Sequence, residues 1–177
     1  MLMAESSPKV PSRLILLRHA KSDYPPGVAD HDRPLNERGR RDASAAGAWI
    51  AEHRDELFDG TAVALVSSAL RAQETWGRIA EHLTDLPSMT EPRLYEAACS
   101  TLMTIADASG ADTVLVVAHN PTIQETASFL AAPGGLGLLD RVRSKYPTCG
   151  LAVLDLSATD PWAGGSADLA AFEVPRG

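Results

Sequence analysis

The sequence predicts an α/β fold, a three-layer α/β/α sandwich around a mostly parallel sheet. Three short apolar runs carry this prediction, at residues 14–17, 62–66 and 113–117, and each is typical of a strand buried on both faces. Segments with apolar residues at helical spacing alternate with these runs, which is the pattern of parallel β-α-β units. The chain has 177 residues, 45% of them apolar, which suits one domain with its own core.

The first half of the chain supplies two strands and two helices. The strand at 14–17 leads into a polar, Pro-rich loop at 21–34. Asn36 can cap the helix that follows, and Gly39 fits a close-packing site within it. The strand at 62–66 is then followed by a second helix, whose apolar positions recur at i, i+3, i+4 and i+7.

The second half continues the alternation. Residues 87–94 are typical of a loop or short strand, and 101–108 of a helix. The strand at 113–117 precedes a helix through Ile123, and a Gly-rich loop follows at 133–137. Two final strands are expected at 148–156 and 169–174. No helix separates them, so they could add an antiparallel edge, and their spacing leaves this open.

Composition excludes several classes of protein. The formal net charge is -7, from 23 acids and 16 bases, which argues against non-specific binding to nucleic acid or membranes. Arg provides 13 of the 16 bases, so a local phosphate-binding pocket stays open. Cys99 and Cys149 form no C-x-x-C pair, and two buried thiols in a reducing compartment are expected.

The ends of the chain favour a soluble, cytoplasmic protein. Residues 1–11 are polar and Pro-punctuated, which predicts a flexible tail before a single domain at 12–177. This stretch has no apolar core of a secretory signal. No apolar run approaches the ~20 residues of a membrane span.

Chemically active side chains gather where the predicted strands end. In open α/β sheets ligands bind beyond the carboxyl ends of the strands, so these groups are expected to converge. Ser68 is a candidate N-cap that would place Arg71 in the first helical turn, where free N–H groups favour an anion. Two arginines and two histidines together describe a phosphate site. The clusters are Arg18-His19, Ser67-Ser68 with Arg71, and His119-Asn120.

A histidine among these cations should have a lowered pKa. A neutral imidazole keeps a nitrogen lone pair and can attack phosphorus. Its other ring nitrogen must then donate to a fixed acceptor, for which a backbone carbonyl of the next loop is expected.

Four ordered segments, with a fifth near the last strands, resemble a known family. They are LLRHAKSD (16–23), RPLNERGRRDA (33–43), SSALRAQET (67–75), VVAHNP (116–121) and KYPT (145–148). In order and spacing they resemble the histidine phosphatase (phosphoglycerate mutase-like) superfamily, and within it the SixA-like phosphohistidine phosphatases. The resemblance covers about residues 14–156 and implies a phosphoglycerate mutase-like fold.

The resemblance also implies roles for four residues. His19 matches the histidine that is transiently phosphorylated. Arg18 and Arg71 match the arginines that hold phosphate oxygens, and His119 matches the second phosphate-binding histidine. Ala20 stands where the wider family has Gly, a departure common in the SixA-like branch.

The roles of Glu96 and of the acidic segment 30–32 are less clear. Glu96 sits where many family members carry a proton donor, although some SixA-like members lack one. The alternative is that Glu96 is an ordinary solvated carboxylate.

Residues 30–32, Asp-His-Asp, superficially resemble a metal cluster. Adjacent residues on an extended loop point in different directions, so a metal there is not expected.

The resemblance thus implies a metal-independent, cofactor-free phosphatase that forms a phosphohistidine intermediate. Its expected substrate is a phosphohistidine protein. The alternatives are a general phosphomonoesterase acting on a small phosphorylated metabolite and, from another class, a non-catalytic phosphate-binding module. Substrate specificity is expected to lie in the loops 21–34 and 133–147, and the oligomeric state stays open.

Overall fold

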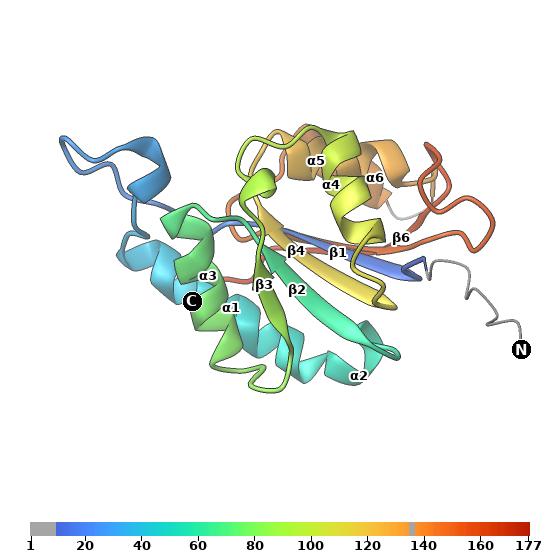
Figure 1. Cartoon of the computed structure of the whole chain (residues 1–177), viewed down its shortest axis with the longest axis horizontal. Coiled ribbons are helices and arrows are strands. Elements are labelled where there is room, and N and C mark those ends of the chain that lie inside the picture. The colour runs from blue at the N-terminus through green and yellow to red at the C-terminus, as the bar shows by residue number, and fades with distance from the viewer. Residues whose placement is uncertain (1–9, 135–136) are drawn as a thin grey trace, which may run out of the picture.

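A computed structural model describes residues 10–134 and 137–177, and Figure 1 shows it as a sheet between two layers of helices. The sheet has six strands in the order β3-β2-β4-β1-β5-β6. The expected tail at 1–11 falls mostly on residues outside the described ranges. The strands are β1 (Arg13–Arg18), β2 (Ala62–Val66), β3 (Ser88–Thr90), β4 (Thr113–Ala118), β5 (Leu151–Asp155) and β6 (Asp168–Glu173).

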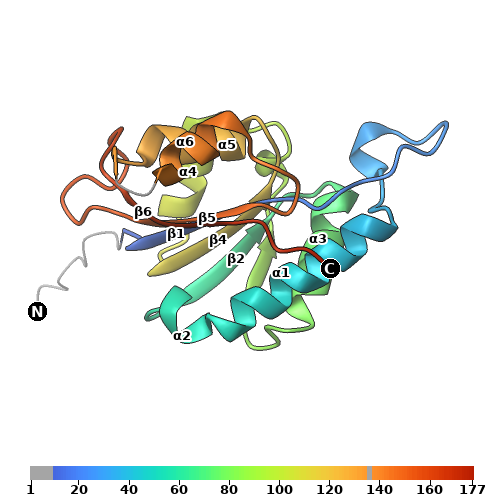
Figure 2. The same cartoon turned by 180° about the vertical axis from the view of Figure 1, so that it is seen from behind.

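The helices divide between the two faces of the sheet. Figure 2 shows α1, α2 and α3 on one face and α4, α5 and α6 on the other. The α-helices are α1 (Glu37–Glu52), α2 (Arg54–Leu57), α3 (Leu70–Ala80), α4 (Cys99–Asp107), α5 (Thr122–Leu130) and α6 (Leu138–Ser144). Two short 3-10 helices, η1 (Asp30–Asp32) and η2 (Pro92–Leu94), lie in the connections.

The sheet is mixed but mostly parallel. Strands β3, β2, β4 and β1 are parallel neighbours, as the β-α-β alternation predicts. Strand β5 pairs with β1 in the antiparallel sense, and β6 pairs with β5 in the same way. The possibility that the last two strands form an antiparallel edge is therefore confirmed. The predicted α/β/α sandwich is also the observed architecture.

The apolar run in β1 is buried on both faces. Leu14 and Leu16 belong to the core under α4, α5 and α6, whereas Ile15 and Leu17 belong to the core under α1 and α3. Each of these four side chains has no exposed surface. Successive residues of a strand point to opposite faces, so a strand with a helix layer on each face needs an unbroken apolar run.

The segment before α1 fixes the loop that follows β1. Asn36 caps α1, because its side chain accepts a hydrogen bond from Gly39 N at 2.8 Å. The Asn36 N–H in turn donates to Lys21 O at 3.0 Å. A Cβ on Gly39 would lie 2.0 Å from Lys21 O, so a side chain there would push this loop away. Both structural predictions for this segment are confirmed.

Two predictions for the second half of the chain need correction. Helix α6 occupies much of a segment expected to be loop, because Leu139 and Val142 bury one face of it against the core. A helix of seven residues after a Gly-rich stretch is too short for a clear periodicity. Cys149 is buried as expected, but Cys99 is only partly buried, and both thiols are free.

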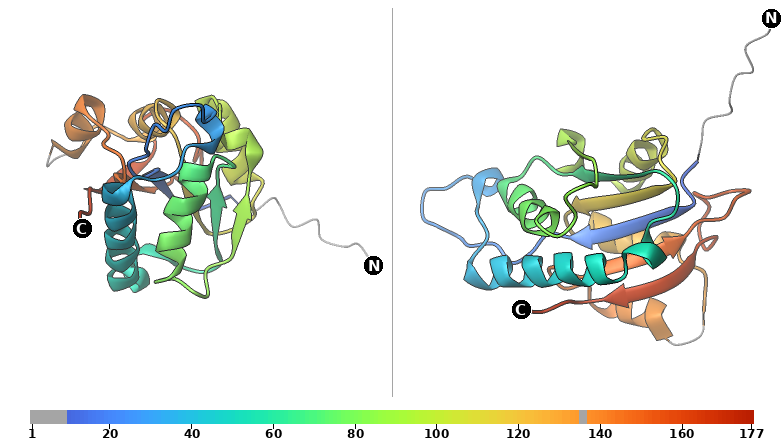
Figure 3. Two further views of the ribbon diagram at one scale, coloured as in Figure 1. Left: turned by 90° about the vertical axis from the view of Figure 1, so that its left-hand side faces the viewer. Right: turned by 90° about the horizontal axis from the view of Figure 1, so that it is seen from below.

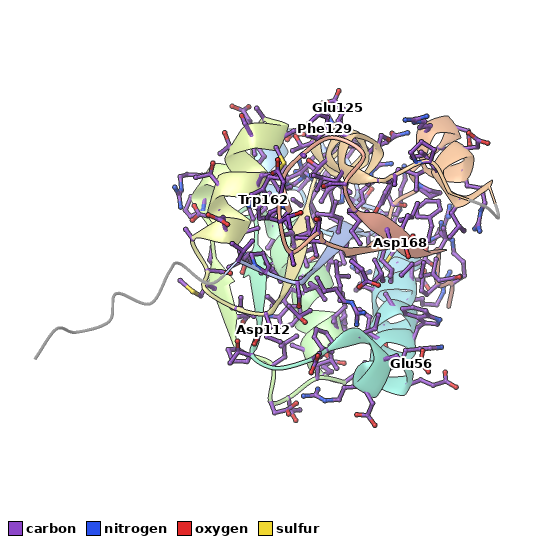
Figure 4. All side chains as sticks on the ribbon, turned by 90° about the vertical axis from the view of Figure 1, so that its right-hand side faces the viewer. Glu56, Asp112, Glu125, Phe129, Trp162 and Asp168 are labelled. Atoms are coloured by element: carbon purple, nitrogen blue, oxygen red, sulfur yellow. The ribbon has the colours of Figure 1, made fainter. Side chains whose placement is uncertain are left out.

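The two ends of the sheet differ. Figure 3 shows α1 along the sheet and the 21–34 loop projecting beyond it, at the end where β1 and β4 finish. Figure 4 shows the opposite end, where Asp112 precedes β4. The Asp112 carboxylate accepts hydrogen bonds from the backbone N–H and the hydroxyl of Thr61, at 2.7 and 2.8 Å. Across the described ranges, no helix is long and apolar enough to cross a membrane.

Candidate active site

A polar cavity of about 210 Å³ lies where the carboxyl ends of β1 and β4 meet the start of α3. Arg18 pairs with Ala118 in the register of these two strands, so His19 and His119 leave the sheet side by side. Arg71 enters from the first turn of α3. Four of the five predicted site residues therefore line one cavity. Its lining residues are Arg18, His19, Lys21, Ser22, Tyr24, Arg33, Arg71, His119, Asn120 and Thr148.

His19 is held with one ring nitrogen fixed and the other available for reaction. Its Nδ1 lies 2.7 Å from the carbonyl oxygen of Ala20. A carbonyl can only accept, so Nδ1 carries the proton and Nε2 keeps its lone pair. Arg71 Nε donates to that Nε2 at 3.3 Å. The expected backbone acceptor for His19 is thus confirmed.

Both cavity histidines are neutral at neutral pH. The pKa of His19 is lowered to about 3, mainly by burial, with smaller contributions from His119, Arg71 and Arg18. Burial also lowers the pKa of His119 to about 4, with a contribution from Arg71. The sequence predicts this direction but assigns it to the arginines, whereas desolvation is the larger cause. A neutral imidazole with a free Nε2 is a competent nucleophile.

Arg18 keeps a donor available beside His19, and Arg71 points its Nε at the His19 ring. Arg18 Nη1 donates to the carbonyl oxygen of Tyr146 at 2.8 Å, which anchors the guanidinium, while Arg18 Nε is buried without a partner. Arg71 is 6% exposed. An anion that enters the cavity would satisfy these donors, and guanidinium groups match phosphate oxygens well.

His119 is oriented by a buried serine at the end of β2. Its Nε2 lies 2.8 Å from the hydroxyl oxygen of Ser67, and its Nδ1 is buried without a partner. When the Ser67 hydroxyl donates to Nε2, the proton of the neutral ring sits on Nδ1. His119 then offers an unused N–H donor in the cavity wall. Its ring centroid lies 5.0 Å from that of His19.

The start of α3 differs from the prediction. Ala69, not Ser68, precedes the helix, and no side chain caps it. The Ser68 hydroxyl instead lies 3.0 Å from His31 Nε2. Helix α3 is fixed in another way, because Thr75 accepts a hydrogen bond from Ala20 N at 2.9 Å and donates to Arg71 O at 2.6 Å. This threonine links the Arg71 backbone to the residue after His19.

Glu96 lies outside the cavity. Its side chain is exposed and is not among the residues that line the site. The neighbouring residue, Tyr95, faces the site instead. The Tyr95 ring meets the His119 ring edge-on at 5.6 Å between centroids. A proton-donor role for Glu96 stays a prediction that no contact in the structure supports.

The Asp-His-Asp segment forms η1 and turns towards the site. Asp30 contacts Arg71 and Tyr95, and His31 contacts Ser68. In residues 10–134 and 137–177, no group of three or more His, Cys, Asp or Glu side chains is arranged to hold a metal.

Sequence reasoning missed three contributors to the site. The sequence places Ser67 at a strand end without a role, and it connects neither Tyr95 nor Asp30 with the phosphate site. The proximity of Ser67 to His119 follows from the rule that parallel strands end at one edge of the sheet. The contact between Asp30 and Tyr95 joins residues 65 positions apart, for which the chain gives no local signal.

The cavity is strongly cationic although the chain is acidic. Its lining includes Arg18, Arg71, Arg33 and Lys21, and it includes no carboxylate. Four positive groups around two neutral imidazoles suit a multiply charged anion such as a phosphoryl group. The arrangement can bind such a group and present a nitrogen nucleophile to it.

Comparison with protein families shows to which family the chain belongs. Residues 14–102, half of the chain, match the histidine phosphatase superfamily (branch 1). The chain belongs to the histidine phosphatase superfamily. The matched part contains His19 and Arg71, while His119 lies beyond it in the sequence and joins them through β4.

Relatives and solved structures agree with this membership. An uncharacterized protein of Mycobacterium tuberculosis is 42% identical over 167 residues, which cover 90% of this chain and all of the relative. An uncharacterized protein of Mycobacterium leprae is 37% identical, with the same coverage. These relatives extend the similarity beyond the matched half to nearly the whole chain.

Among solved structures, a protein assigned as the phosphohistidine phosphatase SixA of Agrobacterium tumefaciens is 30% identical, with a TM-score of 0.76 over 93% of this chain and 99% of its own. The protein histidine phosphatase SixA complexed with tungstate gives a TM-score of 0.71 at 21% identity, over 92% of this chain and 97% of its own. Phosphoglycerate mutase of Plasmodium falciparum gives 0.58 at 21% identity, over 93% and 92%. The fold is thus phosphoglycerate mutase-like.

Proposed function

We propose that this protein is a metal-independent phosphatase that removes phosphate from phosphohistidine in proteins. The observation that carries the proposal is the state of His19, whose Nδ1 proton is held by Ala20 O while Nε2 faces Arg71. A neutral, oriented imidazole between guanidinium groups is suited to attack a phosphoryl group. The likeness to SixA structures supports a phosphorylated substrate.

The reaction proceeds in two displacements. In the first, His19 Nε2 forms a bond to phosphorus, and the bond from phosphorus to the substrate nitrogen breaks. The positive charge that develops on the His19 ring is stabilised by the Ala20 carbonyl, which keeps the Nδ1 proton. Arg18, Arg71 and the free Nδ1–H of His119 hold the equatorial phosphoryl oxygens, where negative charge must be stabilised.

In the second displacement, water attacks phosphorus and the bond to His19 Nε2 breaks. The ring leaves as a neutral imidazole because Nδ1 has kept its proton, so this step needs no acid. Both protons of the water pass to the phosphate, which releases one to solvent at neutral pH. His19 returns to the tautomer of the free protein.

Two features favour a phosphohistidine over a phosphate ester. A substrate imidazole that is protonated before cleavage leaves without help, whereas an alkoxide needs a proton donor. Glu96, the predicted donor, is exposed and lies outside the cavity. The cavity of about 210 Å³ is also smaller than the roughly 300–1,000 Å³ of pockets that enclose a small-molecule ligand, which suits a phosphorylated side chain presented by a protein.

The proposal is tested by comparing substrates in the presence of EDTA. Purified protein is assayed with a phosphohistidine peptide, phosphoramidate and a sugar phosphate, with the His19→Ala variant as the blank. We expect the highest kcat/KM on the phosphohistidine peptide, inhibition by vanadate and no effect of EDTA. A preference for the sugar phosphate would instead make the protein a phosphomonoesterase. Phosphate binding without turnover of any substrate would indicate a binding module.

A further inference from the structure

A carboxylate from the 21–34 loop holds the outer edge of the Arg71 guanidinium. Arg71 Nη1 donates to the backbone oxygen of Asp30 at 2.6 Å, and Arg71 Nη2 donates to the Asp30 carboxylate at 3.1 Å. Arg71 Nε, on the inner edge, faces His19. One residue outside the cavity lining thus fixes two of the three guanidinium nitrogens.

The same carboxylate is held from two further sides. The Tyr95 hydroxyl donates to Asp30 Oδ2 at 2.7 Å, and Arg33 Nε lies 3.3 Å from Asp30 Oδ1. The hydrogen bond from Tyr95 is the largest of the effects that lower the pKa of Asp30, so the group stays charged. Three side chains, of which Arg71 and Tyr95 come from distant parts of the chain, therefore converge on this one loop residue.

Asp30 and the anion that the site is proposed to bind both accept hydrogen bonds from Arg71. A phosphoryl group that reaches His19 comes between Arg18 and Arg71, and Asp30 already occupies the Nη groups of Arg71. A fixed carboxylate orients the guanidinium, and as a like charge it also opposes the binding of a dianion.

We propose that Asp30 is a positioning residue that orients Arg71 for the transition state and limits how tightly the site holds phosphate. This proposal rests on the proposed function, because it assumes that phosphate binds at His19. When phosphate enters, Arg71 Nε turns from His19 to a phosphoryl oxygen while Asp30 keeps hold of the two Nη groups. The Asp30 charge therefore stays close to the bound phosphate, which favours release of the product.

The test uses Asp30→Asn, which removes the charge and keeps the size of the side chain. The matched control is Asp32→Asn, on the same turn of η1, because the Asp32 side chain is 69% exposed and, within the described residues, forms an ion pair only with His31. Two quantities are measured for each protein: the Kd of inorganic phosphate by calorimetry and kcat on phosphoramidate. The Kd needs no turnover, so it tests Asp30 even if the proposed hydrolysis fails.

For Asp30→Asn we expect the Kd of phosphate to fall about tenfold, since a nearby negative charge is lost. We expect kcat to fall by about tenfold as well, because Arg71 is less well oriented. A higher Kd together with a lower kcat would indicate structural damage at the site and would contradict the proposal. Values equal to those of Asp32→Asn would also overturn it.

A second variant tests the hydrogen bond from Tyr95 to Asp30 separately from the charge of Asp30. Tyr95→Phe removes one donor to Asp30 and leaves the charge in place. In Tyr95→Phe we expect kcat to fall. The Kd of phosphate should not fall in this variant, in contrast to Asp30→Asn. Equal tightening in both variants would mean that the Asp30 charge does not oppose phosphate.

Discussion

Arg71 Nε and His19 Nε2 lie 3.3 Å apart, and the arginine donates to the nitrogen that is proposed to attack phosphorus. In the free protein this contact keeps the lone pair of His19 Nε2 directed at the Arg71 guanidinium. A phosphoryl group must enter between the two side chains, and it then replaces the lone pair as the acceptor for Arg71. The contact thus aligns the nucleophile and leaves a donor ready for the transferring group.

The buried histidines predict how stability depends on pH. The pKa values of His19 and His119 are lowered to about 3 and about 4, against about 6.5 in an unfolded chain. Between these values the unfolded chain binds protons that the folded chain excludes, so stability is complete above pH ~6.5 and decreases as the pH falls.

Urea unfolding from pH 7 to pH 4.5 measures this effect. Each histidine that stays neutral contributes up to about 1.4 kcal/mol per pH unit to the decrease in the free energy of unfolding. We expect His19→Gln to reduce the slope by about that amount. The exposed His82 provides the matched control variant, His82→Gln. A slope unchanged by His19→Gln would mean that this imidazole is protonated in the folded protein.

Ser67 is predicted to act through His119. Ser67→Ala removes the hydroxyl that lies 2.8 Å from His119 Nε2 and frees the ring to turn. We expect kcat/KM to fall about tenfold to a hundredfold, because misplacing a group that contacts the transition state is costly. Steady-state kinetics on phosphoramidate provide the measurement.

A second serine–histidine pair offers a control for this variant. Ser44 Oγ lies 3.2 Å from His82 Nε2 on the surface formed by α1 and the end of α3. Ser44→Ala should leave kcat/KM unchanged. Equal losses in Ser67→Ala and Ser44→Ala would indicate a general loss of stability and not a role at His119.

Glu96→Gln tests whether Glu96 donates a proton to the leaving group. Because Glu96 is exposed and outside the cavity, we expect small, equal losses on a phosphohistidine peptide, an aryl phosphate and a sugar phosphate. A proton donor would give a different pattern, with a loss of about 10²–10⁴ on the sugar phosphate and little on phosphohistidine. Measured kcat values for the three substrates distinguish these outcomes.

Much of the fold could be predicted from the chain because its signals are local. An apolar run such as 14–17 must be buried on both faces, and Asn36 caps the helix that begins at the next residue. The convergence of His19 and His119 follows from the rule that parallel strands end at one edge of the sheet. These parts of the prediction needed no knowledge of side-chain packing.

The remaining features depend on packing, which one sequence does not reveal. Ser68 fails as a cap because the helix begins one residue later than expected and His31 takes its hydroxyl. The pKa of His19 depends more on burial than on its charged neighbours, and burial is a property of the whole fold. Asp30 reaches Arg71 only because η1 packs against α3.

The most direct test of the proposed mechanism is to trap the phosphorylated protein. The enzyme is mixed briefly with phosphoramidate, quenched in alkali and digested, and the peptide that contains His19 is examined by mass spectrometry. We predict one phosphate on His19 that survives alkali and is lost in acid. His19→Ala should carry no such label, and its turnover should fall by roughly 10⁶. A phosphate that is stable in acid, or one that persists in His19→Ala, would contradict the central claim.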